Sequence, residues 1–370
     1  MTIFFLVDIA LVVLVLIYRP NKSKVALLSF FLLYLIYGLH DGHGDQFGLG
    51  YDFPHYLDFF QGGSYMYGSV DDLANYDLEL PYFYFCKFLT LFGRTDFVYI
   101  FGTALVYGLP FVYLCWKRSS NPPLSVLMLF TILNTFTYLF FLAAHRQMVA
   151  NTLIFLSYII YMESNVKWKT YISIILLAIA VWAHSSSVLL VPILLVLFLS
   201  KFEYSRKTAM CAIGVTLFIG LFMSSMFGSV ISNLAQLLNT YEIAERSTTH
   251  IINADDLSAS ASSFLTLIPF SIVSAFMLYY SDDNERNSFF GKCMLLACVL
   301  INLLSFVPLI NRIITTLVLF GIAGGIPAAI HTNKNCRLAM MGVMMVLMIM
   351  AYRQYNSPTF RLLPFNFIWE

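Results

Sequence analysis

The chain has 370 residues, of which 59% are hydrophobic, 17% are aromatic and 11% are charged. A soluble domain carries roughly 25% charged residues, and one core could not bury so much apolar surface. The composition therefore predicts an all-α polytopic membrane protein, and the net charge of +1 argues against a nucleic-acid-binding surface. The six cysteines are scattered without zinc or redox spacing, and we expect them to act as small apolar side chains.

Twelve apolar runs are the candidate membrane segments. They cover residues 3–18, 25–39, 97–116, 123–143, 148–162, 171–183, 186–199, 209–227, 264–280, 293–307, 313–330 and 338–352. A straight span takes about 20 residues, so several of these runs are short. Lys and Arg favour cytoplasmic loops, and this rule assigns 14 of the 21 basic residues to six inner loops. The scheme predicts a single transmembrane domain over 1–370, with about 12 segments and both ends outside.

Two outer segments, 40–96 and 228–262, are rich in acidic residues. We expect the first to be a large outer loop that carries short interfacial helices, and the second to be a smaller outer loop. In the first, Asp52 suits a helix N-cap and Pro54 suits the first turn, where a missing N–H is harmless.

One helical face is predicted after this cap. It carries Asp52, His55, Tyr56, Phe59 and Phe60 at helical spacing. Either this face packs against the bundle, or it offers a carboxylate and aromatic rings to a polar ligand. Farther along, Glu79 opens a second apolar helix, whose tyrosines suit sugar faces and also an ordinary membrane aromatic belt.

His145, Arg146 and Gln147 lie at an outer apex between two apolar runs. Ionisable residues beside membrane segments are rare and mark functional sites. Arg146 is either an arginine that extends its charge to the interface or, with a helix N-terminus beside it, a diphosphate-binding group. Arg312 follows Asn311 at another outer apex, with the same two interpretations, and a second arginine would complete a phosphate clamp.

Segment 171–199 contains no charged residue apart from His184 in its protonated form. One tilted helix could cover it, but a single crossing would place Lys201, Arg206 and Lys207 outside, against the charge rule. Two short arms that meet at 182–187 keep these residues inside, and we favour this arrangement. His184 is then at an outer turn, either hydrogen-bonded to a neighbour or active in catalysis.

The residue types point to chemistry without a metal or a cofactor. None of the spacings matches a metal motif, a nucleotide-binding loop or a nucleophile elbow. These residues favour chemistry on a lipid-linked phosphate. Such a substrate itself supplies the free energy that drives the reaction.

The order of these motifs resembles the EpsG/Wzy group of bacterial polysaccharide polymerases, over roughly residues 45–367. The resemblance is carried by Gly50-Tyr51-Asp52 with Tyr56, by Glu79, Pro81 and Tyr82, by Arg146-Gln147, by Ala183-His184-Ser185-Ser186, by Arg312, and by Pro364-Phe365-Asn366-Phe367. Ala183 stands where the family tends to have phenylalanine, and the Glu-Pro stretch is interrupted. Because of these two departures, the resemblance does not identify the exact substrate.

The resemblance implies a GT-C-like membrane glycosyltransferase of the bacterial inner membrane. Such a protein joins repeat units carried on undecaprenyl diphosphate at the periplasmic face, and undecaprenyl diphosphate leaves. Its partners would be the lipid-linked donor and acceptor, membrane lipids and a chain-length-regulating membrane protein. On this analogy, Arg146 and Arg312 bind the diphosphate, Asp52 or His184 accepts the hydroxyl proton, and the substrate contacts Tyr51, His55, Tyr56, Glu79 and Gln147.

Three alternatives remain. A flippase for lipid-linked oligosaccharides would need charges along both halves of the bundle, whereas these charges gather on the outer side. A ligase of the O-antigen type shares the chemistry and differs in its acceptor. A membrane acyltransferase would place its histidine beside an acyl tunnel, and His184 alone does not exclude one.

Overall fold

The computed structural model describes residues 53–63, 71, 80–118, 145–184, 186–239, 261–304, 313–321 and 323. These residues form helices and connecting turns, with no strand among them. The chain divides into two compact units, one formed by Met1–Ile193 with Met344–Glu370 and the other by Leu194–Val343.

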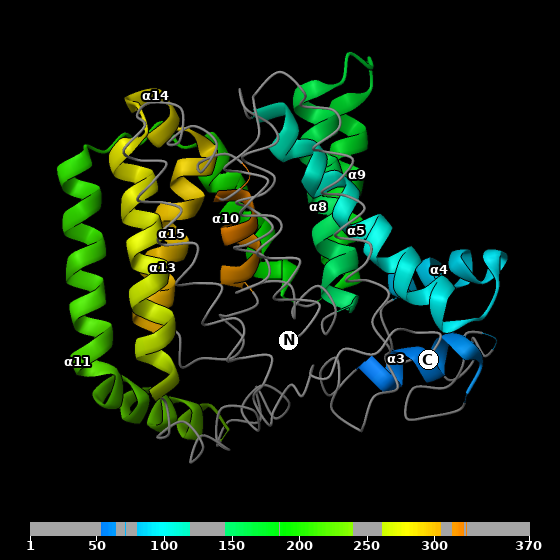
Figure 1. Cartoon of the computed structure of the whole chain (residues 1–370), viewed down its shortest axis with the longest axis horizontal. Helices are drawn as coiled ribbons and strands as arrows, with labels where there is room; N and C mark the ends of the chain where they lie inside the picture. The colour runs from blue at the N-terminus through cyan, green and yellow to red at the C-terminus, as the bar shows by residue number, and fades with distance from the viewer. Residues whose placement is uncertain are drawn as a thin grey trace, which may run out of the picture. The chain divides into compact units, whose positions relative to one another are not determined.

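The first unit contains the helices that carry the predicted site residues His55, Tyr56, Arg146 and Gln147 (Figure 1). They are α3 (Phe53–Gln61), α4 (Leu80–Leu89), the 3-10 turn η2 (Thr90–Phe92), α5 (Asp96–Arg118), α8 (His145–Glu163), α9 (Lys169–Ala183) and the start of α10 (Ser187–Leu199). Helix α3 begins directly after Asp52, with Pro54 in its first turn, as the capping pattern predicts. It ends at Gln61, and the next residue, Gly62, has a left-handed φ of 96°, which favours glycine.

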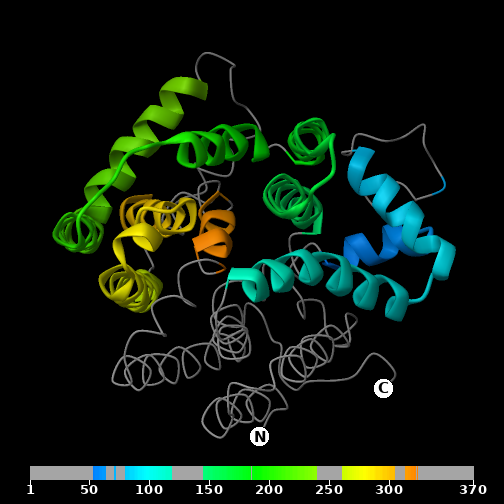
Figure 2. The same cartoon turned by 90° about the horizontal axis from the view of Figure 1, so that it is seen from above.

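Helices α8 and α9 form an antiparallel hairpin closed by the short loop 164–168. The two helices lie side by side in both views (Figures 1 and 2). Ser157 Oγ donates to the Ser173 carbonyl at 3.0 Å, and Ser173 Oγ donates to the Ser157 carbonyl at 2.9 Å. Small hydroxyl residues allow close helix approach and add hydrogen bonds across it, so this serine pair fixes the register of the hairpin.

The second unit is built from the end of α10, α11 (Arg206–Asn239), α13 (Ala261–Tyr280), α14 (Asp283–Arg286), α15 (Phe289–Leu304) and helical residues 313–321. Asn302 of α15 joins three helices. Its amide nitrogen donates to Thr216 Oγ1 of α11 at 3.2 Å, and its oxygen accepts from Ser271 Oγ of α13 at 3.0 Å. A buried amide with partners on both sides specifies how the three helices pack.

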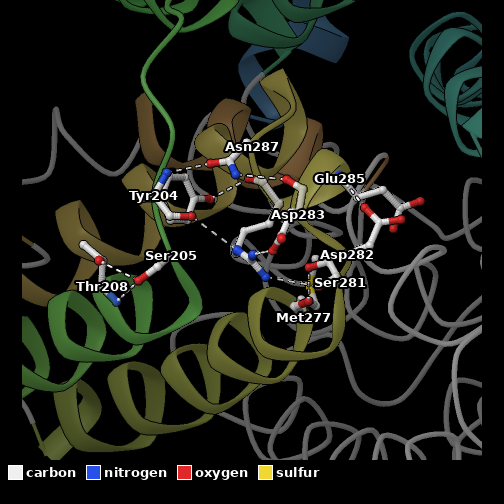
Figure 3. A network of polar contacts seen from close by, with 10 residues as sticks. Tyr204, Ser205, Thr208, Met277, Ser281, Asp282, Asp283, Glu285 and Asn287 are labelled. Carbon is white, nitrogen blue, oxygen red and sulfur yellow. Dashed lines mark hydrogen bonds and ion pairs between the residues drawn. The ribbon is translucent and has the colours of Figure 1, made fainter.

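A polar network joins the loop before α11 to the loop around α14 (Figure 3). We call it the arginine staple, and it consists of Arg286 with Tyr204, Ser281 and Asp283. Arg286 is 2% exposed and donates to the carbonyls of Ser281 at 3.2 Å and Tyr204 at 3.4 Å, and it also pairs with Asp283. Tyr204 Oη donates in return to the Arg286 carbonyl at 2.8 Å. Burial lowers the pKa of Arg286, and nearby Arg206 acts in the same direction. The guanidinium is used as a structural link between two loops.

The helices follow the predicted apolar runs. Runs 97–116, 148–162, 171–183, 186–199, 209–227, 264–280, 293–307 and 313–330 each overlap a described helix. The break predicted within 171–199 is confirmed, because α9 ends at Ala183 and α10 begins at Ser187. Runs 3–18, 25–39, 123–143 and 338–352 lie outside the described residues. Within the described ranges, no helix combines the length and apolarity of a membrane-crossing segment.

The cysteines that the structure describes have free thiols. Cys86, Cys293 and Cys298 are buried, and Cys211 is exposed. The three buried thiols pack inside their units, as expected of small apolar side chains.

Candidate functional site

Two of the predicted site residues, Tyr56 and Arg146, meet in the structure although 90 positions separate them. Arg146 Nε, in the first described turn of α8, donates to Tyr56 Oη of α3 at 3.2 Å. The guanidinium carbon also lies 5.9 Å from the centroid of the Tyr56 ring. Tyr56 is buried and Arg146 is half-buried. The phenol thus orients the guanidinium through both a hydrogen bond and a cation–π contact.

The neighbouring His145 is enclosed by what we call the tyrosine cluster: Tyr56, Tyr82, Tyr99 and Tyr107. Its imidazole is fully buried and stacks on the Tyr99 ring, with centroids 5.1 Å apart and an angle of 18° between the planes. The Tyr56 ring lies 5.3 Å away and the Tyr107 ring 6.0 Å away. Tyr107 Oη donates to the His145 carbonyl at 3.2 Å. These contacts hold the first described turn of α8 against α3 and α5.

Tyr82 of α4 completes the cluster. Its hydroxyl lies 2.7 Å from that of Tyr99, and its ring lies 5.5 Å from that of Tyr56. Because buried tyrosine hydroxyls need hydrogen-bond partners, the Tyr82–Tyr99 pair fixes the position of α4 against α5. The helices α3, α4, α5 and α8 therefore all contribute to the packing that holds His145 and Arg146 in place.

The exposed fractions of the side chains show which aromatic rings of segment 51–85 face outward. Tyr56, Phe59 and Phe60 are all buried, so the aromatic face of α3 packs within its unit, one of the two predicted arrangements. On α4, by contrast, Tyr84 is 61% exposed and Phe88 is 50% exposed. If rings of this region contact a glycan, those of α4 are available for it.

The register of the α8–α9 hairpin brings His184 to the same end as Arg146. Arg146 lies 11 residues before Ser157 on α8, and His184 lies 11 residues after Ser173 at the end of α9. Since the helices are antiparallel, both residues are displaced by about 16 Å from the serine pair in the same direction. A cation and an imidazole from separate predicted motifs therefore share one end of the hairpin.

His184 is buried in the turn between α9 and α10. Its Nδ1 accepts the Ser186 backbone N–H at 3.2 Å and lies 2.7 Å from Ser186 Oγ. Its carbonyl accepts the Ser187 N–H at 2.9 Å. The extended backbone of His184, with φ −162° and ψ 133°, ends α9, and its side chain bonds the backbone of the turn that precedes α10.

The remaining predicted site residues divide into two groups. Gln147 is buried on α8, and His55 lies on α3 with its side chain outside the described part. Tyr51, Asp52, Glu79 and Arg312 lie outside the described residues. Tyr99 and Tyr107 were not predicted as members of the site, because aromatic residues within apolar runs resemble core or belt residues. His145 was named beside Arg146 at the outer apex, but no role was assigned to it.

An exposed ion-pair cluster links Asp71 to Lys87 of α4 and to Arg94. Asp71 pairs with Arg94 at 2.7 Å and with Lys87 at 3.2 Å. Hydrogen bonds from Arg94 and then Lys87 lower the pKa of Asp71 to about 2. Among the described residues, no group of three or more His, Cys, Asp or Glu side chains could hold a metal ion. The chemistry available at the hairpin end is binding of an anion by an oriented guanidinium, with an imidazole at the same level.

One comparison with known proteins gives a match. The family model described as "EpsG family" matches residues 42–367, which is most of the chain. No curated protein and no solved structure matches the chain significantly.

Proposed function

Because the chain belongs to the EpsG family, the family of Wzy-type polysaccharide polymerases, we propose that it polymerises oligosaccharide repeat units carried on undecaprenyl diphosphate. The family is associated with glycosyltransferase-like polymerase activity and with membranes. The specific proposal adds the donor, its diphosphate leaving group and a site at the periplasmic face of a polytopic inner-membrane bundle. Membrane lipids and a chain-length-regulating membrane protein are the further expected partners.

The observation that carries the proposal is the contact between Tyr56 and Arg146. A guanidinium recognises a diphosphate through paired N–H groups and must be held in one orientation to do so. The Tyr56 hydroxyl accepts the Nε hydrogen at 3.2 Å, which restricts the orientation of the guanidinium. Tyr56 is neutral, so this contact orients the cation without cancelling its charge.

In the proposed transfer, a hydroxyl of the incoming unit attacks the anomeric carbon of the donor glycan. The bond from that carbon to the diphosphate oxygen breaks, and its electron pair remains with undecaprenyl diphosphate. Arg146 and Arg312 stabilise the charge that grows on the leaving group. Asp52 or His184 accepts the hydroxyl proton. Tyr51, His55, Glu79 and Gln147 are proposed to bind the sugar or diphosphate groups around this centre.

The test is chain growth by purified protein supplied with one lipid-linked repeat unit. Wild-type protein should give a ladder of products, whereas Arg146→Ala and Arg312→Ala should give none. Arg206→Ala is a matched control, because Arg206 is an exposed arginine of the second unit. Relocation of the unit without coupling would indicate a flippase, and transfer onto a lipid A acceptor without a ladder would indicate a ligase. A full ladder from both arginine variants would refute the clamp.

A further inference from the structure

The turn between α9 and α10 determines which nitrogen of His184 carries a hydrogen. The Ser186 backbone N–H points at Nδ1, at an N–N distance of 3.2 Å. A backbone N–H is always a donor, so Nδ1 must be the acceptor and must use its lone pair. The Ser186 hydroxyl, at 2.7 Å from the same atom, therefore donates to Nδ1 as well.

This arrangement leaves one neutral form of the ring. With Nδ1 unprotonated, the hydrogen of a neutral imidazole is on Nε2. A proton on Nδ1 would oppose the Ser186 N–H and break the hydrogen bond between His184 and Ser186 in this turn. The nitrogen that faces away from the turn is therefore a donor, and the nitrogen with a lone pair is turned toward the backbone.

We propose that His184 acts in the transfer step as a hydrogen-bond donor through Nε2–H to the departing diphosphate, and that it is not the proton acceptor. This inference rests on the proposed polymerase function and assigns a role within it. The hairpin register supports the location, since His184 shares the end of the α8–α9 pair at which Arg146 is held.

In this proposal, His184 and Arg146 stabilise the leaving group and Asp52 takes the proton, so every bond and proton of the reaction is accounted for. The oxygen–carbon bond of the new glycosidic link forms as the carbon–oxygen bond to the diphosphate breaks. The Nε2–H of His184 and the guanidinium of Arg146 stabilise the diphosphate oxygens that receive the electron pair, and both keep their hydrogens. The proton of the attacking hydroxyl passes to the Asp52 carboxylate, which directly precedes α3, the helix that carries Tyr56.

A second polar group in the same turn supports an anionic ligand there. Ser187, the first residue of α10, is fully buried, and its hydroxyl has no hydrogen-bond partner among the described residues. A buried hydroxyl is expected to have a partner, and a phosphate oxygen would supply one. The first turn of a helix also favours a negative group through its oriented N–H dipoles.

The first test examines the tautomer and needs no substrate. Solid-state nitrogen spectra of histidine-labelled protein in lipid should show one ring with hydrogen on Nε2 and a hydrogen-bonded, unprotonated Nδ1. The signal is identified by its loss in His184→Gln. A hydrogen on Nδ1, in either the neutral or the charged ring, would overturn the inference.

The second test separates donor from base by substitution. In the chain-growth assay, His184→Gln retains an N–H donor near the Nε2 position but has no basic nitrogen, whereas His184→Glu offers a carboxylate base and no donor. We expect His184→Gln to be at least tenfold faster than His184→Ala, and His184→Glu to be no faster than His184→Ala. The comparison uses proteins whose unfolding midpoints match the wild type.

The two proposals fail in different ways. A ladder-forming enzyme whose Gln variant is no better than its Ala variant, or whose Glu variant is the active one, overturns the donor role alone. A wild-type protein that forms no ladder overturns the polymerase function, and the donor role in transfer falls with it.

Discussion

Two arginines, Arg146 and Arg286, show how the same side chain is used in opposite ways in the two units. Arg286 is almost fully buried, and its partners are two backbone carbonyls and the Asp283 carboxylate. Arg146 is half-buried, and its contacts include the hydroxyl and the ring of Tyr56, a neutral phenol. A carboxylate neutralises a guanidinium, whereas a phenol only orients it.

The difference teaches that the partner of an arginine is more informative than its position in a charge pattern. By sequence, Arg286 marks an inner loop and Arg146 an outer apex. In the structure, Arg286 links two loops of one unit, whereas Arg146 contacts the ring and the hydroxyl of Tyr56. Variants of the two residues should therefore separate activity from stability, and the following predictions make that comparison.

The largest effect is expected from Arg146→Ala. Removing a preorganised donor to a leaving group typically lowers kcat by about 10²–10³-fold. Chain growth should fall by at least this factor, while the midpoint of thermal unfolding in detergent changes little, because a half-buried side chain is lost. An activity within threefold of wild type, at unchanged stability, would contradict the assignment.

Arg286→Ala should give the reverse result. Its loss leaves the buried carbonyls of Ser281 and Tyr204 without their donor, and each unsatisfied buried group costs about 1–3 kcal/mol. The unfolding midpoint should fall clearly, while chain growth per folded molecule stays near wild type. The matched control is Arg94→Ala, which breaks an exposed ion pair and should change the midpoint little. Equal effects of the two substitutions would show that the arginine staple does not stabilise the fold.

Tyr56→Phe should have an intermediate effect. It keeps the ring beneath the guanidinium and removes only the hydroxyl that accepts from Arg146 Nε. A hydrogen bond to a charged group contributes about 1.5–3 kcal/mol, so kcat/KM should fall about tenfold or more. Tyr171→Phe, which changes an exposed tyrosine near the start of α9, is the control and should stay within about twofold.

The smallest effect concerns pH and the exposed pair at Asp71. The pKa of the Asp71 carboxyl in the folded state is lowered from 3.8 to about 2 by Arg94 and Lys87. A lowered carboxyl pKa stabilises the fold above the unfolded pKa, and the contribution is lost as pH falls through the folded value. The unfolding midpoints of wild type and Asp71→Asn should therefore differ slightly at pH 7 and converge as pH falls from 3.8 to about 2. A difference as large at pH 2 as at pH 7 would contradict the assigned pairing.

The sequence was sufficient for the local helices, because their signals are local. Apolar runs, the Asp52–Pro54 pattern and the uncharged segment 171–199 located α3, α9 and α10 within a few residues. The charge rule favoured a break near His184, and α9 ends at Ala183. Each of these features depends on propensity and periodicity within one stretch of chain.

The sequence was insufficient for contacts between distant residues. Arg146 and Tyr56 were each predicted, but nothing in their spacing indicated that one binds the other. His145 and Tyr99 form a stacked pair from different helices, and each alone resembles an ordinary residue near an apolar run. For His184 the residue type suggested a proton acceptor, and only the position of the Ser186 N–H distinguishes the two ring nitrogens.

The most direct test of the central claim is a double-mutant cycle between Tyr56 and Arg146, measured as kcat/KM for chain growth. Arg146→Lys keeps the positive charge and removes the Nε that donates to Tyr56. If Tyr56 acts by orienting the guanidinium, Tyr56→Phe lowers kcat/KM about tenfold in the wild type and has almost no further effect in the Arg146→Lys background. Equal losses from Tyr56→Phe in both backgrounds would show that the two residues act independently, and would contradict the account.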